Sequence, residues 1–173
     1  MKALAERLRA LHAGPRPLIL PNAWDVASAL AVERAGAVAI ATTSSGVAAT
    51  LGYPDGEAIP AEEMLDAVRR MASAVELPVT ADLEAGYGLS ADELVARMLE
   101  AGAVGLNLED SVRDGTEPRL GPMEPQAERI AAAGAGIDLM YLAATGALVL
   151  GAIPLEDARA ALTAMARERG LGG

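Results

Sequence analysis

Short apolar segments alternate with amphipathic segments along almost the whole chain. Apolar runs typical of buried strands occupy residues 18–20, 37–41, 78–81, 104–108 and 147–150. Helices are predicted at residues 1–11, 25–34, 60–75, 90–102, 124–133 and 154–169. Because strands that alternate with helices form right-handed βαβ units, this pattern predicts an α/β fold with a parallel sheet.

The predicted units form a single domain over residues 1–173. Residues 15–133 are expected to make the first four β/α units. Residues 137–169 are expected to add a last helix–strand–helix segment, whose first helix we place at residues 137–144. A closed barrel of eight units typically needs about 250 residues, whereas this chain supplies about five units. The expected architecture is therefore an incomplete TIM-type (β/α) barrel, with polar loops at residues 42–59 and 110–124.

The composition argues against several classes of function. The formal net charge is −10, and binding to nucleic acid or to an anionic membrane surface needs clustered Lys and Arg instead. The chain has no cysteine, so thiolate catalysis, disulfides and cysteine-type zinc sites are excluded. The uncharged stretches 35–54 and 139–155 are interrupted by Gly and Pro, and we interpret them as buried strands with their flanks. We expect a soluble, cytoplasmic protein.

Carboxylates follow two neighbouring predicted strands where each strand ends. Asp82 and Glu84 are two residues apart, so on a strand both side chains would point to the same face. Glu109 ends the next strand, and adjacent strands lie about 4.8 Å apart. The three acids are therefore expected to converge on one cation, and hard oxygen ligands favour Mg²⁺ or Mn²⁺. The alternative is that these acids cap helices or face solvent.

Other polar positions have both a functional and a purely structural interpretation. The loop 42–47 could hold a carboxylate or phosphate through backbone N–H groups and hydroxyls, or be an ordinary connection. Asp55 is most simply a turn residue, Trp24 a core residue, and Asp25 a helix N-cap.

Four segments together resemble the isocitrate lyase/phosphoenolpyruvate mutase superfamily. They are L-P-N-A-W-D at 20–25, T-T-S-S-G-V at 42–47, A-D-L-E-A-G-Y-G at 81–88 and G-L-N-L-E-D-S at 105–111. Their order and spacing are similar to those of short bacterial members described as carboxyvinyl-carboxyphosphonate phosphorylmutase-like. The resemblance covers roughly residues 15–133. It implies a TIM-type barrel, a bound Mg²⁺ (or Mn²⁺), and cleavage or formation of C–C or C–P bonds through a metal-stabilised enolate.

The resemblance also implies roles for individual residues. The positions that match the metal-binding acids are Asp82, Glu84 and Glu109, some of which act through water. The positions that match the substrate-binding residues are Trp24, Ser45, Gly46 and Val47. Asp55 matches a mobile-loop position near the site, and we expect Asp55 and Asp82 to be the catalytic residues. The expected ligand is a small carboxylate.

The chain also departs from the family pattern. The cysteine-containing loop of isocitrate and methylisocitrate lyases is absent, so that lyase chemistry is not expected. The family's I-N-A-R-T-D strand is absent too, which suggests an internal deletion of about three of the eight barrel units. Neither Arg113 nor Arg119 is assigned to replace the arginine of that strand. Exposed strand edges would favour a homo-oligomer. A remnant that binds metal and carboxylate without turnover is the alternative function.

Overall fold

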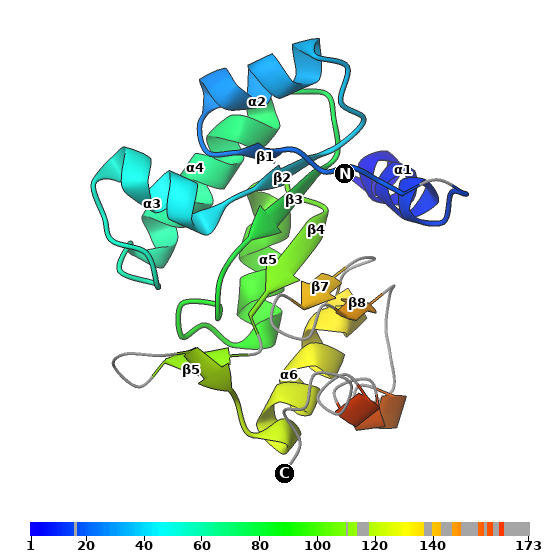
Figure 1. Ribbon diagram of the computed structural model, residues 1–173, viewed down its shortest axis with the longest axis vertical. Coiled ribbons are helices and arrows are strands. Elements are labelled where there is room, and N and C mark those ends of the chain that lie inside the picture. The colour runs from blue at the N-terminus through cyan, green and yellow to red at the C-terminus, as the bar shows by residue number, and fades with distance from the viewer. Residues whose placement is uncertain are drawn as a thin grey trace.

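A computed structural model describes residues 1–15, 17–109, 111–113, 118–136, 140–142, 147–149, 156–157, 159–160 and 163–164. Its centre is a six-stranded sheet in the order β1-β2-β3-β4-β7-β8 (Figure 1). The strands are β1 (Asn22–Ala23), β2 (Ile40–Thr42), β3 (Val79–Asp82), β4 (Gly105–Leu108), β7 (Met140–Leu142) and β8 (Ala147–Val149). The pairs from β1 to β7 are all parallel, whereas β8 runs antiparallel to β7. This is the α/β, barrel-type order of strands expected from the sequence, in an incomplete form.

Between residues 2 and 136, six helices connect and cover these strands. They are α1 (Lys2–His12), α2 (Val26–Arg34), α3 (Ser44–Leu51), α4 (Ala61–Ala74), α5 (Ala91–Glu100) and α6 (Met123–Gly136). Helices α2, α4, α5 and α6 pack against one another in that order and cover one face of the sheet. Figure 1 shows α1 apart from this layer, beside the beginnings of the strands. None of the helices in the described part of the chain has the length and apolar character needed to cross a membrane.

Local sequence explains where several helices begin. The Asp25 carboxylate accepts the backbone N–H of Ser28 at 2.7 Å, and the Ser28 hydroxyl in turn accepts the N–H of Asp25. This capping box starts α2 at the predicted residue. The hydroxyl of Ser90 accepts the N–H of Glu93 and starts α5 in the same way.

The core has two parts. The larger part lies between the sheet and the helix layer, where α4 alone buries Met64, Leu65, Val68 and Met71 at helical spacing. The smaller part is formed by Leu8 of α1 with Ala39 and Val104, which directly precede β2 and β4. Helix α1 therefore closes the end of the sheet where the strands begin, and the opposite end is left for the polar loops.

Several local predictions were wrong. Residues 18–20 are not a strand, because the first sheet pairing begins at Asn22. The predicted loop 42–59 contains α3, and the predicted loop 110–124 contains an antiparallel pair, β5 (Ser111–Arg113) with β6 (Pro118–Leu120). Part of the predicted helix 137–144 is strand β7. These segments are short, so local propensity specifies their state weakly; β7, for example, is a strand because it pairs with the distant β4.

The C-terminal segment is described only in part. The predicted strand 147–150 is confirmed at Ala147–Val149. Most of the predicted helix 154–169 lies outside the described residues, and the residues described there, 156–157, 159–160 and 163–164, are helical.

Candidate active site

Asp82 is the last residue of β3 and lies at the carboxyl end of the parallel sheet, where α/β folds place their ligands. Its Oδ2 accepts two hydrogen bonds from Ser44, one from the backbone N–H at 2.9 Å and one from the hydroxyl at 2.8 Å. Its backbone N–H donates to the hydroxyl of Thr42 at 2.9 Å. Two contacts from Ser44, at the start of α3, therefore fix this carboxylate, and the contact from Thr42, at the end of β2, fixes the backbone that carries it.

Glu84 lies two residues beyond Asp82 and is 2% exposed. Its Oε2 accepts the backbone N–H of Glu57 at 2.8 Å, and its Oε1 accepts the hydroxyl of Tyr87 at 2.9 Å. Burial raises the pKa of the Glu84 carboxyl, the two hydrogen bonds oppose that rise, and the negative charges of Asp55 and Glu57 add to it. Glu84 is therefore a buried carboxyl whose protonated form is favoured relative to an exposed glutamate.

The three predicted metal ligands are only partly brought together. Glu109 follows β4, and its backbone N–H donates to the carbonyl of Glu84 at 2.7 Å, so the two backbones are adjacent. Among the residues that the structure describes, however, no three His, Cys, Asp or Glu side chains are grouped so that they could hold a metal ion. The expected convergence of Asp82, Glu84 and Glu109 on one cation is thus not present in their side chains.

The physical reason lies in the backbone after Asp82. Strand β3 ends there, and Glu84 adopts a left-handed conformation with φ of 46°. The alternation rule that placed Asp82 and Glu84 on one face holds only within a strand. The Glu84 carboxylate is instead held by Glu57 and Tyr87.

The segment 42–47 forms the start of helix α3. The N–H of Ser44 is taken by Asp82, and that of Val47 donates to the carbonyl of Thr43 at 3.0 Å. Within the described residues, the N–H groups of Ser45 and Gly46 have no hydrogen-bond acceptor. These two groups lie at the positive end of the helix dipole, where an anion is stabilised.

Gly46 packs directly under the indole of Trp24. A Cβ atom at residue 46 would lie 2.9 Å from the Cβ of Trp24 and 2.7 Å from the Cγ2 of Thr43. Trp24 itself is 44% exposed, so it is a surface residue supported on one side rather than a core residue. The close approach explains why glycine occupies position 46.

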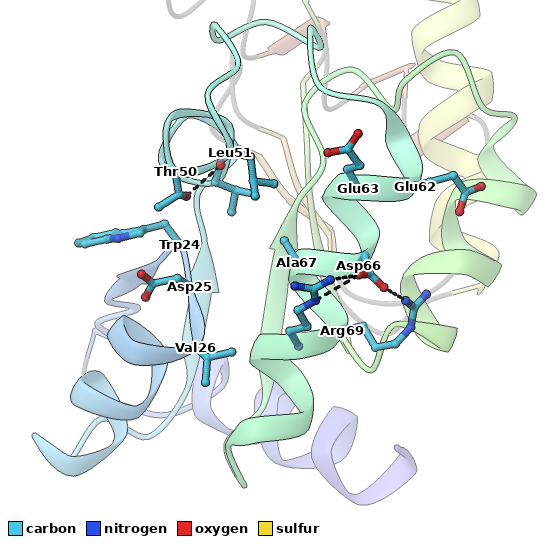
Figure 2. Close-up of a pocket in the computed structure, with 12 residues that line it drawn as sticks. Trp24, Asp25, Val26, Thr50, Leu51, Glu62, Glu63, Asp66, Ala67 and Arg69 are labelled. Carbon is cyan, nitrogen blue, oxygen red and sulfur yellow. Dashed lines mark hydrogen bonds and ion pairs between the residues drawn. The ribbon is translucent and has the colours of Figure 1, made fainter.

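Trp24 and Val47 also line a cleft of about 500 Å³ between α2, α3 and α4. Figure 2 shows this cleft, with Trp24 on one wall and the ion pair of Asp66 with Arg69 on the other. The predicted residues Ser45, Gly46, Asp55, Asp82, Glu84 and Glu109 do not line it. The cleft is thus separate from the carboxylates at the strand ends, and Trp24 and Val47 lie between the two regions.

Asp55 lies in the exposed loop between α3 and α4. Its charge contributes to the raised pKa of Glu84, which places it near the buried carboxyl. The same loop contributes Glu57, whose Oε1 accepts the backbone N–H of Tyr87 at 2.6 Å. The loop with Asp55 is therefore fastened to the loop that follows β3.

Four contributors to this region were missed by sequence reasoning. They are Ser44, Glu57, Tyr87 and Arg129, which bond Asp82, Glu84 or the backbone of residue 85. Ser44 and Tyr87 belong to segments that the sequence analysis identified as motifs. Ser44 bonds Asp82, which lies on a different segment, and Tyr87 bonds Glu84, which was expected to bind a metal ion. Glu57 and Arg129 had no local signal, since their partners are 27 and 44 residues away.

Comparison with known proteins gives one family. The family described as "Phosphoenolpyruvate phosphomutase" matches residues 8–169. The 2-methylisocitrate lyase of Escherichia coli strain K12 is 33% identical over 164 residues, which cover 88% of this chain and 55% of the relative.

Two solved structures have a similar fold. Phosphoenolpyruvate phosphomutase from Streptomyces platensis subsp. rosaceus has a TM-score of 0.72 at 29% identity, covering 93% of this chain and 61% of that chain. A phosphonopyruvate hydrolase, solved in complex with oxalate and Mg²⁺, has a TM-score of 0.73 at 25% identity, covering 80% and 51%. This chain thus spans little more than half the length of these relatives.

Proposed function

Because the chain belongs to the phosphoenolpyruvate phosphomutase family, we propose that it is a Mg²⁺-dependent lyase or phosphonomutase acting on a small 2-oxo or enol carboxylate. The observation that carries this proposal is the junction between Asp82 and the start of α3. There a carboxylate fixed by Ser44 lies beside the backbone N–H groups of Ser45 and Gly46, which have no acceptor among the residues that the structure describes. Such a junction provides a ligand for a cation and donors for an anion within a few residues.

We infer a magnesium site in which one acid would bind the ion directly and others would act through water. Oδ1 of Asp82 receives only a 3.5 Å contact from the N–H of Glu84 in the described part of the chain, so this oxygen can accept a cation. Both oxygens of Glu84 already accept hydrogen bonds. We therefore assign Asp82 as the direct ligand, and Glu84 and Glu109 as acceptors for water molecules around the ion. Mn²⁺ suits the same oxygen donors.

The start of α3 would bind the substrate carboxylate. The N–H groups of Ser45 and Gly46 supply two donors, the Ser45 hydroxyl a third, and the helix dipole favours the negative charge. Trp24 and Val47 would form the apolar wall beside these donors. The chain's own groups thus orient the carboxylate with its reacting carbon toward Asp82.

Charge and proton handling complete the proposed mechanism. A bound magnesium ion would neutralise the negative charge that develops on the oxo and carboxylate oxygens as an enolate forms. Asp55, on the exposed loop, is the proposed catalytic carboxylate that approaches the reacting atoms from the open side. Glu84, whose pKa is raised by burial, holds the loop through its hydrogen bonds with Glu57 and Tyr87.

The test is a substrate panel with and without magnesium. Oxaloacetate, a 2-methylmalate-like acid and phosphonopyruvate are incubated with the protein, and pyruvate, oxalate, phosphate and phosphoenolpyruvate, the product of a mutase acting on phosphonopyruvate, are measured. We expect turnover of at least one substrate that EDTA abolishes and that Asp82→Asn lacks. The matched control is Asp92→Asn, which changes an exposed acid in the first turn of α5.

The alternative proposal is a non-catalytic member of the family. It would bind Mg²⁺ and a small carboxylate without turnover. Thermal stabilisation by Mg²⁺ with oxalate, without any product from the panel, would support this alternative over the enzyme.

Assembly and location are also proposals. The sheet has β1 and β8 as its edge strands in the described part of the chain, and an exposed edge favours pairing with a second copy. We expect a cytoplasmic homo-oligomer, and light scattering coupled to gel filtration measures its mass. A monomer at micromolar concentration would contradict this expectation.

A further inference from the structure

The loop before α4 and the loop after β3 are joined by reciprocal hydrogen bonds. The backbone N–H of Glu57 donates to the Glu84 carboxylate at 2.8 Å, and the Glu57 carboxylate accepts the backbone N–H of Tyr87 at 2.6 Å. The Tyr87 hydroxyl then returns to Glu84 at 2.9 Å. Each glutamate thus fixes the backbone of the opposite loop.

The same three residues carry unusual backbone conformations. Glu57, Glu84 and Tyr87 have φ of 60°, 46° and 56°, and they are the non-glycine residues with positive φ in the described part of the chain. A left-handed conformation is disfavoured for residues with a Cβ and persists only where the surroundings hold it. The strain of this chain is therefore concentrated where the two loops meet.

Helix α6 supplies a cation to this junction. The guanidinium of Arg129 donates from Nη2 to the carbonyl of Ala85, between Glu84 and Tyr87. Burial lowers the pKa of Arg129, and the negative charge of Glu57 opposes that shift. Gly86 leaves the necessary room, since a Cβ there would lie 2.7 Å from Nη2 of Arg129.

We propose that Glu57 and Arg129 are positioning residues that lock the two strand-end loops into one unit, which we call the loop clasp (Glu57, Glu84, Tyr87 and Arg129). The clasp holds Glu84 beside Asp82 and holds the loop of Asp55 over the site. The role of the clasp in ligand binding rests on the proposed function, whereas the locking of the two loops does not depend on that function. Neither residue needs to touch the substrate.

Hydrogen exchange of the free protein tests whether the clasp exists. Arg129→Met removes the donor to Ala85 while keeping an apolar stem. We expect the amides of Glu57 and Tyr87, which Arg129 does not bond, to exchange at least about tenfold faster, because local opening exposes them together. The amides of β3 should exchange as before. Arg129→Lys keeps the charge and should restore part of the protection, which also covers the case that Arg129→Met fails to fold.

Binding of Mg²⁺ with oxalate tests whether the clasp positions the site. By calorimetry we expect Glu57→Ala and Arg129→Met each to weaken oxalate binding at least about tenfold, and Glu57→Gln to weaken it less. The double variant Glu57→Ala, Arg129→Met should bind oxalate no more weakly than the single variant with the lower affinity, because the effects of substituting coupled residues do not add. The control is Arg97→Met, a helix arginine paired with Glu62 and Glu93.

The outcomes separate the two proposals. Unchanged exchange at residues 57 and 87 in Arg129→Met would overturn the clasp. Faster exchange with unchanged oxalate affinity would overturn its positioning role. If the unmodified protein does not bind Mg²⁺ with oxalate, the proposed function and the positioning role both fail, while the exchange data still decide whether the loops are locked.

Discussion

Ser44 holds the carboxylate of Asp82 with both its backbone N–H, at 2.9 Å, and its hydroxyl, at 2.8 Å. The two residues are 38 positions apart in the chain and come from neighbouring strand ends. A serine at the start of α3 therefore sets the orientation of the acid that is proposed to bind the metal.

Substituting Ser44→Ala should lower the free energy of unfolding by about 1.5 kcal/mol, because a hydrogen bond to a charged group is lost. Urea denaturation measures this change. Ser45→Ala is the control, since Ser45 is exposed and, among the described residues, its hydroxyl contacts the hydroxyl of Thr43 at 3.2 Å. Equal stability of the two variants would contradict the role given to Ser44.

Asp82→Asn should weaken Mg²⁺ binding by more than about 100-fold, since outer-shell partners alone typically contribute 10–100-fold to metal affinity. The fold should survive, because the amide oxygen can still accept the N–H of Ser44. Calorimetric titration with Mg²⁺ measures the affinity, and Asp92→Asn is the matched control. Unchanged affinity would show that Asp82 does not bind the ion.

Gly46→Ala should displace the indole of Trp24, because the added Cβ would lie 2.9 Å from the Trp24 Cβ. Overpacking of this kind costs about 1–3 kcal/mol, which exceeds the gain from placing alanine in a helix. The chain has one tryptophan, so its fluorescence reports on Trp24 alone. We expect a shifted emission maximum and a lower unfolding midpoint. An unshifted spectrum with higher stability would show that Trp24 does not rest on Gly46.

The stability of the metal-free protein should depend on the pKa of Glu84. Burial raises that pKa above its ordinary value of 4.5, so between the ordinary and the raised pKa the native state binds more protons than the unfolded state. The free energy of unfolding therefore falls as the pH rises through this interval, and the loss is complete above the raised pKa.

The glutamine in Glu84→Gln cannot ionise, so the free energy of unfolding of this variant should not fall over this pH interval. Denaturation curves at a series of pH values from 4.5 upward, without divalent cations, measure it. Glu100→Gln, an exposed acid at the end of α5, should retain the pH dependence of the unmodified protein. The same fall in Glu84→Gln would show that another group is responsible.

The sequence by itself determined the features that depend on neighbouring residues. Asp25 begins α2 because its side chain reaches an N–H three residues away, and α4 follows from an apolar spacing that any helix would bury on one face. Asp82 and Glu109 could likewise be placed at strand ends, because apolar runs precede both. The family resemblance rested on the same short segments.

Tertiary structure alone decided how the acids are used. Glu84 lies beyond the end of β3 and has a left-handed backbone conformation, so the alternation of side chains along a strand does not apply to it. Its carboxylate accepts hydrogen bonds from Glu57 and Tyr87 and does not converge with those of Asp82 and Glu109. Strand β7 and the α3 start had no strong local signal, since pairing and packing partners tens of residues away stabilise them. Local propensity decides which element a segment can form. The direction of a buried carboxylate is decided by whichever distant donors the folded chain brings to it.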